Sequence, residues 1–169
     1  MSIAPLAIEA MSDIRYVHAS SVRTSTGQVL TSDEVEAFTE AVLSERYTED
    51  LIRAMRQGQI LGARIGDSLV GTAGWTVVDG PDPVARVGWV HVRPMFSDSG
   101  VGTALVAEVE TLVRQAGFAV LTTASTVNAV AFFEQLGFDV TSHGVRSLGR
   151  LQMPIVFMRK RLDRVKSTA

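Results

Sequence analysis

The chain has 169 residues, 46% of them hydrophobic, and a formal net charge of −2 at pH 7. This length suits a single domain with a substantial core, and the composition excludes an intrinsically disordered protein. The sequence contains no cysteine, which excludes disulfides, cysteine-ligated metals and thiol nucleophiles, and its three histidines lack metal-binding spacing, so no metal site is expected.

The first third of the chain predicts one strand followed by three helices. They are expected at 6–10, 13–20, 31–44 and 48–58. Residues 21–30 are polar and contain glycine, which predicts a loop between the first two helices. Thr31 and Glu34 have the spacing of a capping box, in which each side chain bonds the backbone of the other at the start of a helix.

From residue 59 onward the pattern combines strands and helices. Gly66 and Asp67 stand between two apolar, β-branched runs and predict a hairpin turn. Strands are expected at 59–65, 69–78, 84–92, 118–124, 138–143 and 153–159, and helices at 101–116 and 129–136. Such an order predicts a mixed α/β fold.

Charge is distributed unevenly along the chain. Five basic residues and one acid lie in 159–169, which leaves 11 basic and 17 acidic residues, a net of −6, in 1–158. We therefore expect one domain over 1–158 and a basic tail over 159–169, and an acidic body of this kind argues against a nucleic-acid partner. No apolar run is long enough to span a bilayer and the first residues do not resemble a signal peptide, so a cytoplasmic protein without a membrane partner is expected. The high apolar content suggests a homodimer.

The segment 97–103 lies where a strand ends and a helix begins. Unpaired N–H groups at a helix N-terminus bind phosphate, and Gly100 and Gly102 allow a ligand to approach the backbone closely. Leu105 stands where a dinucleotide fingerprint needs a third small residue, and no Gly-Lys-Ser/Thr sequence forms a Walker motif. On these residues alone, a tight turn without a ligand is the alternative.

Two longer runs resemble the signatures of one family. Residues 92–105 resemble the acetyl-CoA motif of the GNAT superfamily of N-acetyltransferases, and residues 128–138, which end in Leu-Gly-Phe, resemble its second signature. The resemblance implies an α/β (α+β) fold with a mixed, mostly antiparallel central sheet flanked by helices. In that fold the sheet splays apart between the strand ending at Val92 and the strand ending near Ala124, and the first of these strands usually carries a bulge.

The resemblance also implies a site for acetyl-CoA as acetyl donor. Pantetheine lies in the splayed gap, the pyrophosphate lies on the amides of 98–103, and the second signature packs beside the cofactor. The cofactor-binding residues implied in this way are Val90, His91, Val92, Ser97, Asp98, Ser99, Gly100, Val101, Gly102, Thr103, Thr126, Asn128, Phe132 and Phe133.

Three positions depart from the family pattern. Ser97 replaces a usual Gln or Arg, and Asp98 brings a negative charge next to the expected pyrophosphate, so weaker cofactor binding is expected. Phe133 stands where many members have a tyrosine that can protonate the leaving thiolate.

The general base is the open question at this stage. Arg86 and Gly88 stand where some members carry a Glu or His that can act as the general base. This leaves His91 as the titratable candidate late in this strand. The alternative is a packed or surface His91, with water relaying the proton. His143 and Tyr16 are weaker candidates.

The expected activity is transfer of an acetyl group from acetyl-CoA to a primary amine of a small molecule or a protein, by direct attack. The alternative is an acyl-CoA sensor or partner domain with little turnover. Seven acids between residues 31 and 50 either attract a cationic amine or form a solvated helix face. Trp75, Trp89 and Phe96 either flank an acceptor pocket or belong to the core.

Overall fold

A computed structural model describes residues 1–25 and 29–162. Its centre is a seven-stranded sheet in the order β1-β2-β3-β4-β5-β7-β6. Neighbouring strands are antiparallel except for the parallel pair β4 and β5, which confirms the mixed, mostly antiparallel fold. The strands are β1 (Ser2–Pro5), β2 (Ile60–Ile65), β3 (Ser68–Val78), β4 (Val84–Val92), β5 (Val120–Thr126), β6 (Asp139–Leu148) and β7 (Leu151–Arg161).

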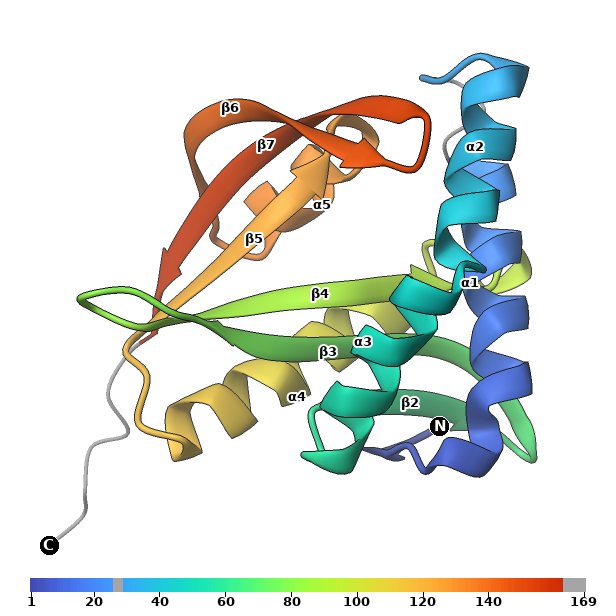
Figure 1. Ribbon diagram of the computed structural model, residues 1–169. Coiled ribbons are helices and arrows are strands. Elements are labelled where there is room, and N and C mark those ends of the chain that lie inside the picture. Colours follow the sequence, from blue (N-terminus) through green and yellow to red (C-terminus); the bar gives the residue numbers. More distant parts are fainter. Residues whose placement is uncertain (26–28, 163–169) are drawn as a thin grey trace, which may run out of the picture.

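Helices cover both faces of this sheet. In Figure 1, α1 and α3 lie in front of the sheet and α4 lies behind it. No helix in the described ranges is long and apolar enough to cross a membrane. The helices are α1 (Met11–Ser25), α2 (Ser32–Val42), α3 (Glu45–Arg56), α4 (Val101–Gln115) and α5 (Val130–Gln135), with short 3₁₀ turns η1 (Ile8–Ala10), η2 (Pro94–Phe96) and η3 (Val127–Ala129).

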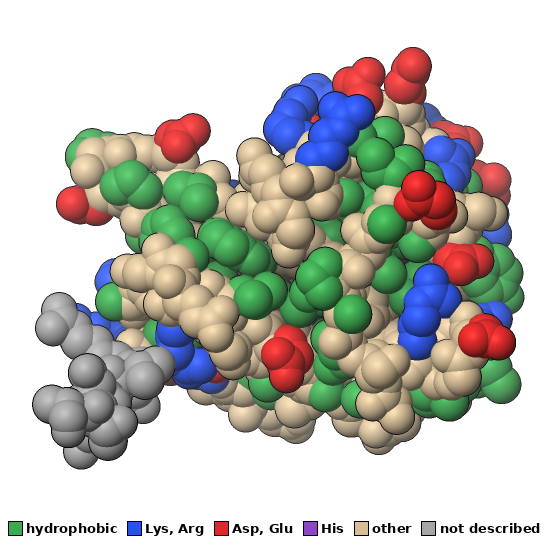
Figure 2. All heavy atoms as spheres, turned by 90° about the horizontal axis from the view of Figure 1, so that it is seen from below, with side chains coloured by type: hydrophobic (Ala, Val, Ile, Leu, Met, Phe, Trp, Pro, Cys, Tyr) green, Lys and Arg blue, Asp and Glu red, His purple; other side chains and the backbone are tan. Residues whose placement is uncertain are grey.

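The core is divided by the sheet. A large cluster packs α4 and α5 against one face, and Leu105, Val109 and Leu121 are fully buried in it. A second cluster packs α1 and α3 against the other face around Ile14 and Leu51. Seen from below, acidic and basic side chains are interspersed on the surface, and hydrophobic side chains lie between them (Figure 2).

The sheet separates between β4 and β5. These strands pair only where Ala85–Val87 meets Leu121–Thr123, and then diverge toward the right of Figure 1. The Thr122 hydroxyl donates to the Ala85 carbonyl at 3.0 Å, and the Thr123 hydroxyl donates to the Val87 carbonyl at 3.3 Å. We call the diverging segments, residues 88–92 of β4 and 124–126 of β5, the fork. It matches the predicted splay.

A β-bulge lies in β4 just beyond the start of the fork. Between the pairs Gly74–Gly88 and Thr72–His91, β4 has one residue more than β3. Trp89 lies in this bulge with a φ of 51°. A Cβ at Gly74 would lie 2.5 Å from a side chain of β2 and 3.1 Å from the Trp89 ring. The absence of a side chain at Gly74 therefore makes room for the bulged strand.

The structure corrects the expected boundaries in the first third of the chain. The first strand is Ser2–Pro5 rather than 6–10, and the helix expected to end near residue 20 continues to Ser25, because Val22 is buried against the neighbouring elements. Part of the expected loop, residues 26–28, lies outside the described residues. The capping box of Thr31 and Glu34 is present as predicted. The next helix begins at Glu45, three residues earlier than expected, because the Ser44 side chain caps it.

The C-terminal part is more ordered than the pattern indicated. Residues 144–152, which lie between the two strands expected at 138–143 and 153–159, belong to the β6–β7 hairpin. Arg159–Arg161, expected in a basic tail, are strand residues paired with Val120–Thr122, and the Lys160 ammonium lies 2.6 Å from the Glu110 carboxylate. The rest of the expected tail, 163–169, lies outside the described residues.

Candidate functional site

The fork exposes one edge of each of two strands. Beyond Val87, the described pairs of β4 are with β3 alone, and beyond Thr123 those of β5 are with β7 alone. Backbone N–H and C=O groups that face the gap are free to bind an extended ligand as a strand would. Val90, His91 and Val92, which the sequence proposed as cofactor contacts, lie on this edge.

The N-terminus of α4 opens next to the end of β4. Asp98 and Gly100 both have positive φ, 59° and 85°, so the chain turns sharply before the helix. Gly100 occupies the N-cap position, where no side chain bonds the helix. The first-turn N–H groups of residues 101–103 therefore have no acceptor within the helix, and they lie at the positive end of the helix dipole. The Thr103 side chain is exposed there.

The hydroxyl of Ser99, one of the proposed cofactor-binding residues, bonds within its own turn. It donates to the Phe96 carbonyl, so its proton is engaged inside the turn. Ser97 ends η2, and its N–H donates to the Pro94 carbonyl at 3.1 Å. The Ser99 hydroxyl therefore has no proton left for a ligand, whereas backbone N–H groups at the start of α4 could bind a phosphate.

The second signature seats α5 on the start of α4. A Cβ at Gly102 would lie 3.3 Å from the Phe132 ring and 3.6 Å from the Val92 side chain, so a small residue allows this contact. Phe133 is only 5% exposed and packs edge to face between Phe132 and Phe138. A buried benzene ring supplies no proton, so this position contributes packing.

The proposed contacts Thr126 and Asn128 lie at the open end of the fork. The Asn128 amide donates to the Ser25 carbonyl at 3.2 Å and so links η3 to the end of α1. A hollow of about 140 Å³ lies beside them, and Val29, Leu30 and Met153 form part of its wall. The helices of the first third therefore reach across to the far arm of the fork.

A buried hydrogen-bond chain ends on the bulge. The Thr72 hydroxyl donates to the Trp89 carbonyl at 2.7 Å, which leaves its oxygen to accept from Nε2 of His18 at 2.8 Å. Nδ1 of His18 then accepts from the Tyr47 hydroxyl at 3.0 Å. The direction of every bond follows from the carbonyl, which can only accept. The bonds fix one tautomer of His18 and hold the Trp89 carbonyl toward β3.

The His91 ring packs against the His18 ring of this hydrogen-bond chain. Its ring centroid lies 4.2 Å from that of His18, and its Nδ1 lies 3.4 Å from the Ser21 hydroxyl. Burial lowers the pKa of His91 to about 4. Burial, and then the charge that His91 would carry, lower the pKa of His18 well below its ordinary value. Both rings are therefore neutral at pH 7.

Sequence reasoning missed the residues of this hydrogen-bond chain. His18, Tyr47 and Thr72 are 29 and 54 residues from one another along the sequence, and none belongs to a motif. Their alignment depends on α1, α3 and β3 meeting in one core. The available signal was His18 itself, a polar residue within an apolar helical stripe.

The weaker candidates lie elsewhere. His143 is exposed on β6, the edge strand of the sheet. Tyr16 is 59% exposed, and the Arg93 guanidinium lies 4.9 Å from its ring centroid. Among the aromatic candidates, Trp75 packs against the α4 cluster and Trp89 against the α1–α3 cluster.

Several acids of the first third have partners on the surface. Arg150, at the tip of the β6–β7 hairpin, lies 2.8 Å from Asp33 and 3.7 Å from Glu40. Glu34 accepts from the Thr31 N–H in the capping box. These carboxylates tie α2 to the hairpin and to its own first turn.

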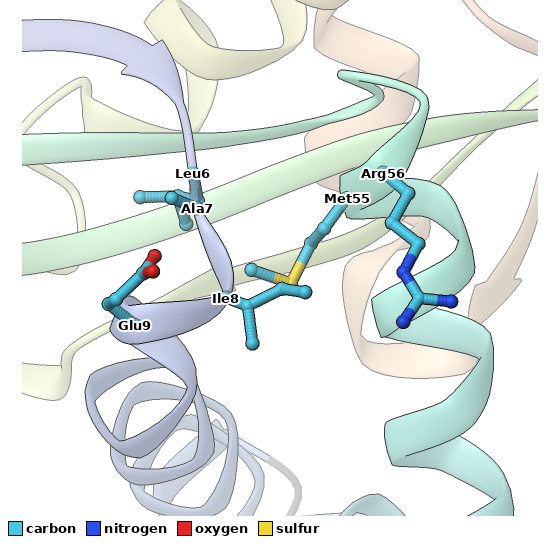
Figure 3. Close-up of a pocket in the computed structure, with 6 residues that line it drawn as sticks. All are labelled: Leu6, Ala7, Ile8, Glu9, Met55 and Arg56. Atoms are coloured by element: carbon cyan, nitrogen blue, oxygen red, sulfur yellow. The ribbon is translucent and has the colours of Figure 1, made fainter.

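A larger hollow of about 280 Å³ lies away from the fork. The segment after β1 and the end of α3 enclose it, and Figure 3 shows Leu6, Ile8 and Met55 along its wall with the charged side chains of Glu9 and Arg56 beside it. None of the residues proposed from the sequence lines it. Within the described ranges, no group of three or more His, Asp or Glu residues is placed to hold a metal ion.

Comparisons with known proteins agree with this geometry. A model of the acetyltransferase (GNAT) family matches residues 28–138. Among solved structures, a GCN5-related N-acetyltransferase from Rhodopseudomonas palustris is 24% identical, with a TM-score of 0.81 and 95% of each chain covered. A PaiA N-acetyltransferase from Thermoplasma acidophilum, solved with coenzyme A, is 19% identical, with a TM-score of 0.75 over 95% of this chain and 98% of that one.

A third similar structure is the ribosomal-protein-alanine N-acetyltransferase from Brucella melitensis. It is 18% identical, with a TM-score of 0.69 over 96% of this chain and 100% of that one. At these identities the likeness shows the fold alone. No match was found among curated proteins.

Proposed function

The chain belongs to the acetyltransferase (GNAT) family, and from this premise we propose that it transfers an acetyl group from acetyl-CoA to a primary amine by direct attack. The observation that carries the proposal is the fork, which opens beside the uncapped N-terminus of α4. The fork can bind an extended ligand through backbone groups, and the N-terminus of α4 can bind a diphosphate.

The residues of the fork and of the α4 loop fit coenzyme A. The backbone of Val90 and Val92 would bind the pantetheine arm, and the amides from Asp98 to Thr103 would bind the pyrophosphate. Acetyl-CoA supplies an acetyl group activated as a thioester. The Asp98 carboxylate is exposed at the same turn and weakens this site, since it repels phosphate.

The chain contributes to catalysis mainly by positioning. The bulge lies in the segment of β4 that borders the gap, and the buried hydrogen-bond chain through His18 holds the bulge in one conformation. An amine attacks only in its neutral form, so its proton must be removed. Neutral His91 is placed beside the fork and is the proposed acceptor of that proton.

A binding domain with little turnover is the second candidate. The observation in its favour is Phe133, which is buried and has no hydroxyl to protonate the leaving thiolate. Direct transfer tolerates this loss, because a thiol with a pKa of about 8.5 leaves readily as its anion.

The test is free-thiol release from acetyl-CoA across a panel of amines, combined with thermal shift. We expect coenzyme A to raise the melting temperature and at least one amine to accelerate thiol release. Stabilisation without amine-dependent release would instead support the binding domain. If neither coenzyme A nor acetyl-CoA stabilises the protein, the proposed cofactor is wrong.

His91→Ala tests the proposed base. We expect turnover at pH 7 to fall about tenfold, less than the ~10²–10⁴ typical of a general base, because a base of low pKa contributes less. The midpoint of stabilisation by coenzyme A should stay unchanged, since the α4 loop is untouched. His143→Ala is the matched control, because His143 is exposed on the edge strand. An unchanged rate and pH profile in His91→Ala would leave proton removal to water.

A further inference from the structure

Arginines from two different strands face the same side of the sheet. Arg86 comes from β4 and Arg146 from β6, and the positive charge of Arg86 acts on Arg146 and lowers its pKa. The Arg86 guanidinium also lies 5.9 Å from the ring centroid of Phe157 on β7. These residues are 60 and 71 positions apart in sequence, so the sheet order brings them together. We call Arg86, Arg146 and Phe157 the arginine cluster.

The strand register explains how Arg86 crosses to β7. Arg86 pairs with Thr122, and the next residue of β5 on the same face is Ala124, which pairs with Phe157. The small Ala124 side chain lets the guanidinium extend over β5 to the ring. Gly144 lies behind the ring, since a Cβ there would come within 2.8 Å of it.

Arg146 lies on the same face of the sheet, on the neighbouring strand β6. It follows Gly144 by two residues on β6, so both positions face the same side of the strand. Because Arg86 alternates with the buried residues Ala85 and Val87, it too faces away from α4. The arginine cluster therefore lies on the face that α1 and α3 cover in part (Figure 1).

The charges of the cluster have no counter-ion. Across residues 1–25 and 29–162, no ion pair and no side-chain hydrogen bond joins Arg86 or Arg146 to another residue. The Nε of Arg86 is buried without a partner. Arg146 is an exposed residue of β6, and burial of part of its side chain and then the neighbouring Arg86 charge lower its pKa. Arg86 is half-buried, and its buried Nε–H lacks the partner that a buried donor needs, so this arrangement favours an external anion.

Open space lies beside Gly88, at the start of the fork, on the face that carries Arg86. Gly88 lies between Arg86 and the bulge and faces the same side as Arg86, and a Cβ placed on it would find no atom within 4 Å. A side chain at this position would fill that space. The sheet face at Gly88 is therefore open beside Arg86.

We propose that the acceptor is an amine that also carries a carboxylate, which Arg86 and Arg146 bind while the amine reaches the fork across Gly88. The inference rests on the proposed acetyl transfer and names its substrate class. Guanidinium groups bind carboxylates through paired, charge-assisted hydrogen bonds, which gives both affinity and orientation. It differs from the alternative in which the acids of residues 31–50 attract a cationic amine.

The test compares matched acceptors at equal concentration. A series of unbranched ω-amino carboxylates is assayed against the corresponding ω-amino amides and diamines, by thiol release from acetyl-CoA. We expect the best carboxylate to exceed its amide at least tenfold in kcat/KM. Arg86→Gln and Arg146→Gln should each remove most of this preference and leave stabilisation by coenzyme A unchanged. Arg53→Gln is the control, because Arg53 is an exposed surface residue paired with Asp50.

A binding measurement separates this inference from the proposed function. Calorimetry with coenzyme A present should detect the amino carboxylate in the wild-type protein and not in Arg86→Gln. Binding of this kind without turnover would overturn acetyl transfer and support the arginine cluster. Turnover in which amides or diamines equal the carboxylates, or in which both arginine variants keep the preference, would overturn the cluster and leave acetyl transfer standing. Neither turnover nor selective binding would overturn both.

Discussion

Acidification from pH 6.5 to pH 4 is expected to destabilise the protein by several kcal/mol, at about 1.4 kcal/mol per pH unit for each histidine held neutral. His18 is fully buried, and the His91 ring stacks on it. Both pKa values are lower in the folded protein than in the unfolded chain, where histidine titrates near 6.5. The unfolded state therefore binds more protons in this range, and stability falls as the pH falls.

The measurement is the free energy of unfolding by urea at several pH values. Above about pH 7 the two histidines should contribute no slope, because they are neutral in both states. His91 is partly exposed, so His18 is expected to contribute the larger share. His91→Gln should reduce the slope, whereas His143→Gln should leave it unchanged because His143 is exposed. A wild-type stability that stays flat from pH 6.5 to 4.5 would contradict the buried, neutral state of both rings.

Thr103→Asp is expected to weaken binding of coenzyme A about 10- to 100-fold, since a negative charge next to a bound diphosphate costs about 1–3 kcal/mol at the protein surface. Thr103 is exposed in the first turn of α4, where a carboxylate favours the helix through its dipole. Folding stability without ligand should therefore stay equal or rise. Loss of binding together with retained stability is the signature of a phosphate site, and calorimetry with coenzyme A measures it.

Two further variants serve as a charge-matched control and as a change in the opposite direction. Thr111→Asp changes the net charge equally on the same helix, two turns farther along, and should leave affinity unchanged. Asp98→Asn removes the repelling carboxylate, and asparagine tolerates the positive φ of this position, so affinity should rise up to about tenfold. Equal affinity in Thr103→Asp and the wild type would show that the diphosphate lies elsewhere.

Most elements of the fold follow from local sequence patterns. Thr31 and Glu34 form the predicted capping box, and Gly66 forms the predicted turn between β2 and β3 with a φ of 58°. The errors lie where distant contacts outweigh local preference. The polar end of α1 stays helical because Val22 packs with residues of α2 and β7, and the β6–β7 hairpin extends through a segment without a strand pattern.

The two parts of the candidate site differ in how much of them can be predicted from the sequence. The α4 loop and the α5 signature are continuous segments, so their residue types and spacing are visible in the sequence. The chain from Tyr47 through His18 to the bulge, and the cluster of Arg86 with Arg146, join residues of separate elements. No local pattern relates such residues, because their contact depends on strand order and register.

Local sequence patterns are sufficient to predict the mixed fold, the family signatures and the glycines at the start of α4, since each depends on neighbours a few residues apart. The pairing of charges depends instead on contacts between distant segments. The tertiary structure places Asp33 and Glu40 against Arg150 and leaves Arg86 and Arg146 without an acid. The physical reason is that pKa values and the cost of a charge depend on burial and on distances across the sheet, which the order of residues along the chain does not specify.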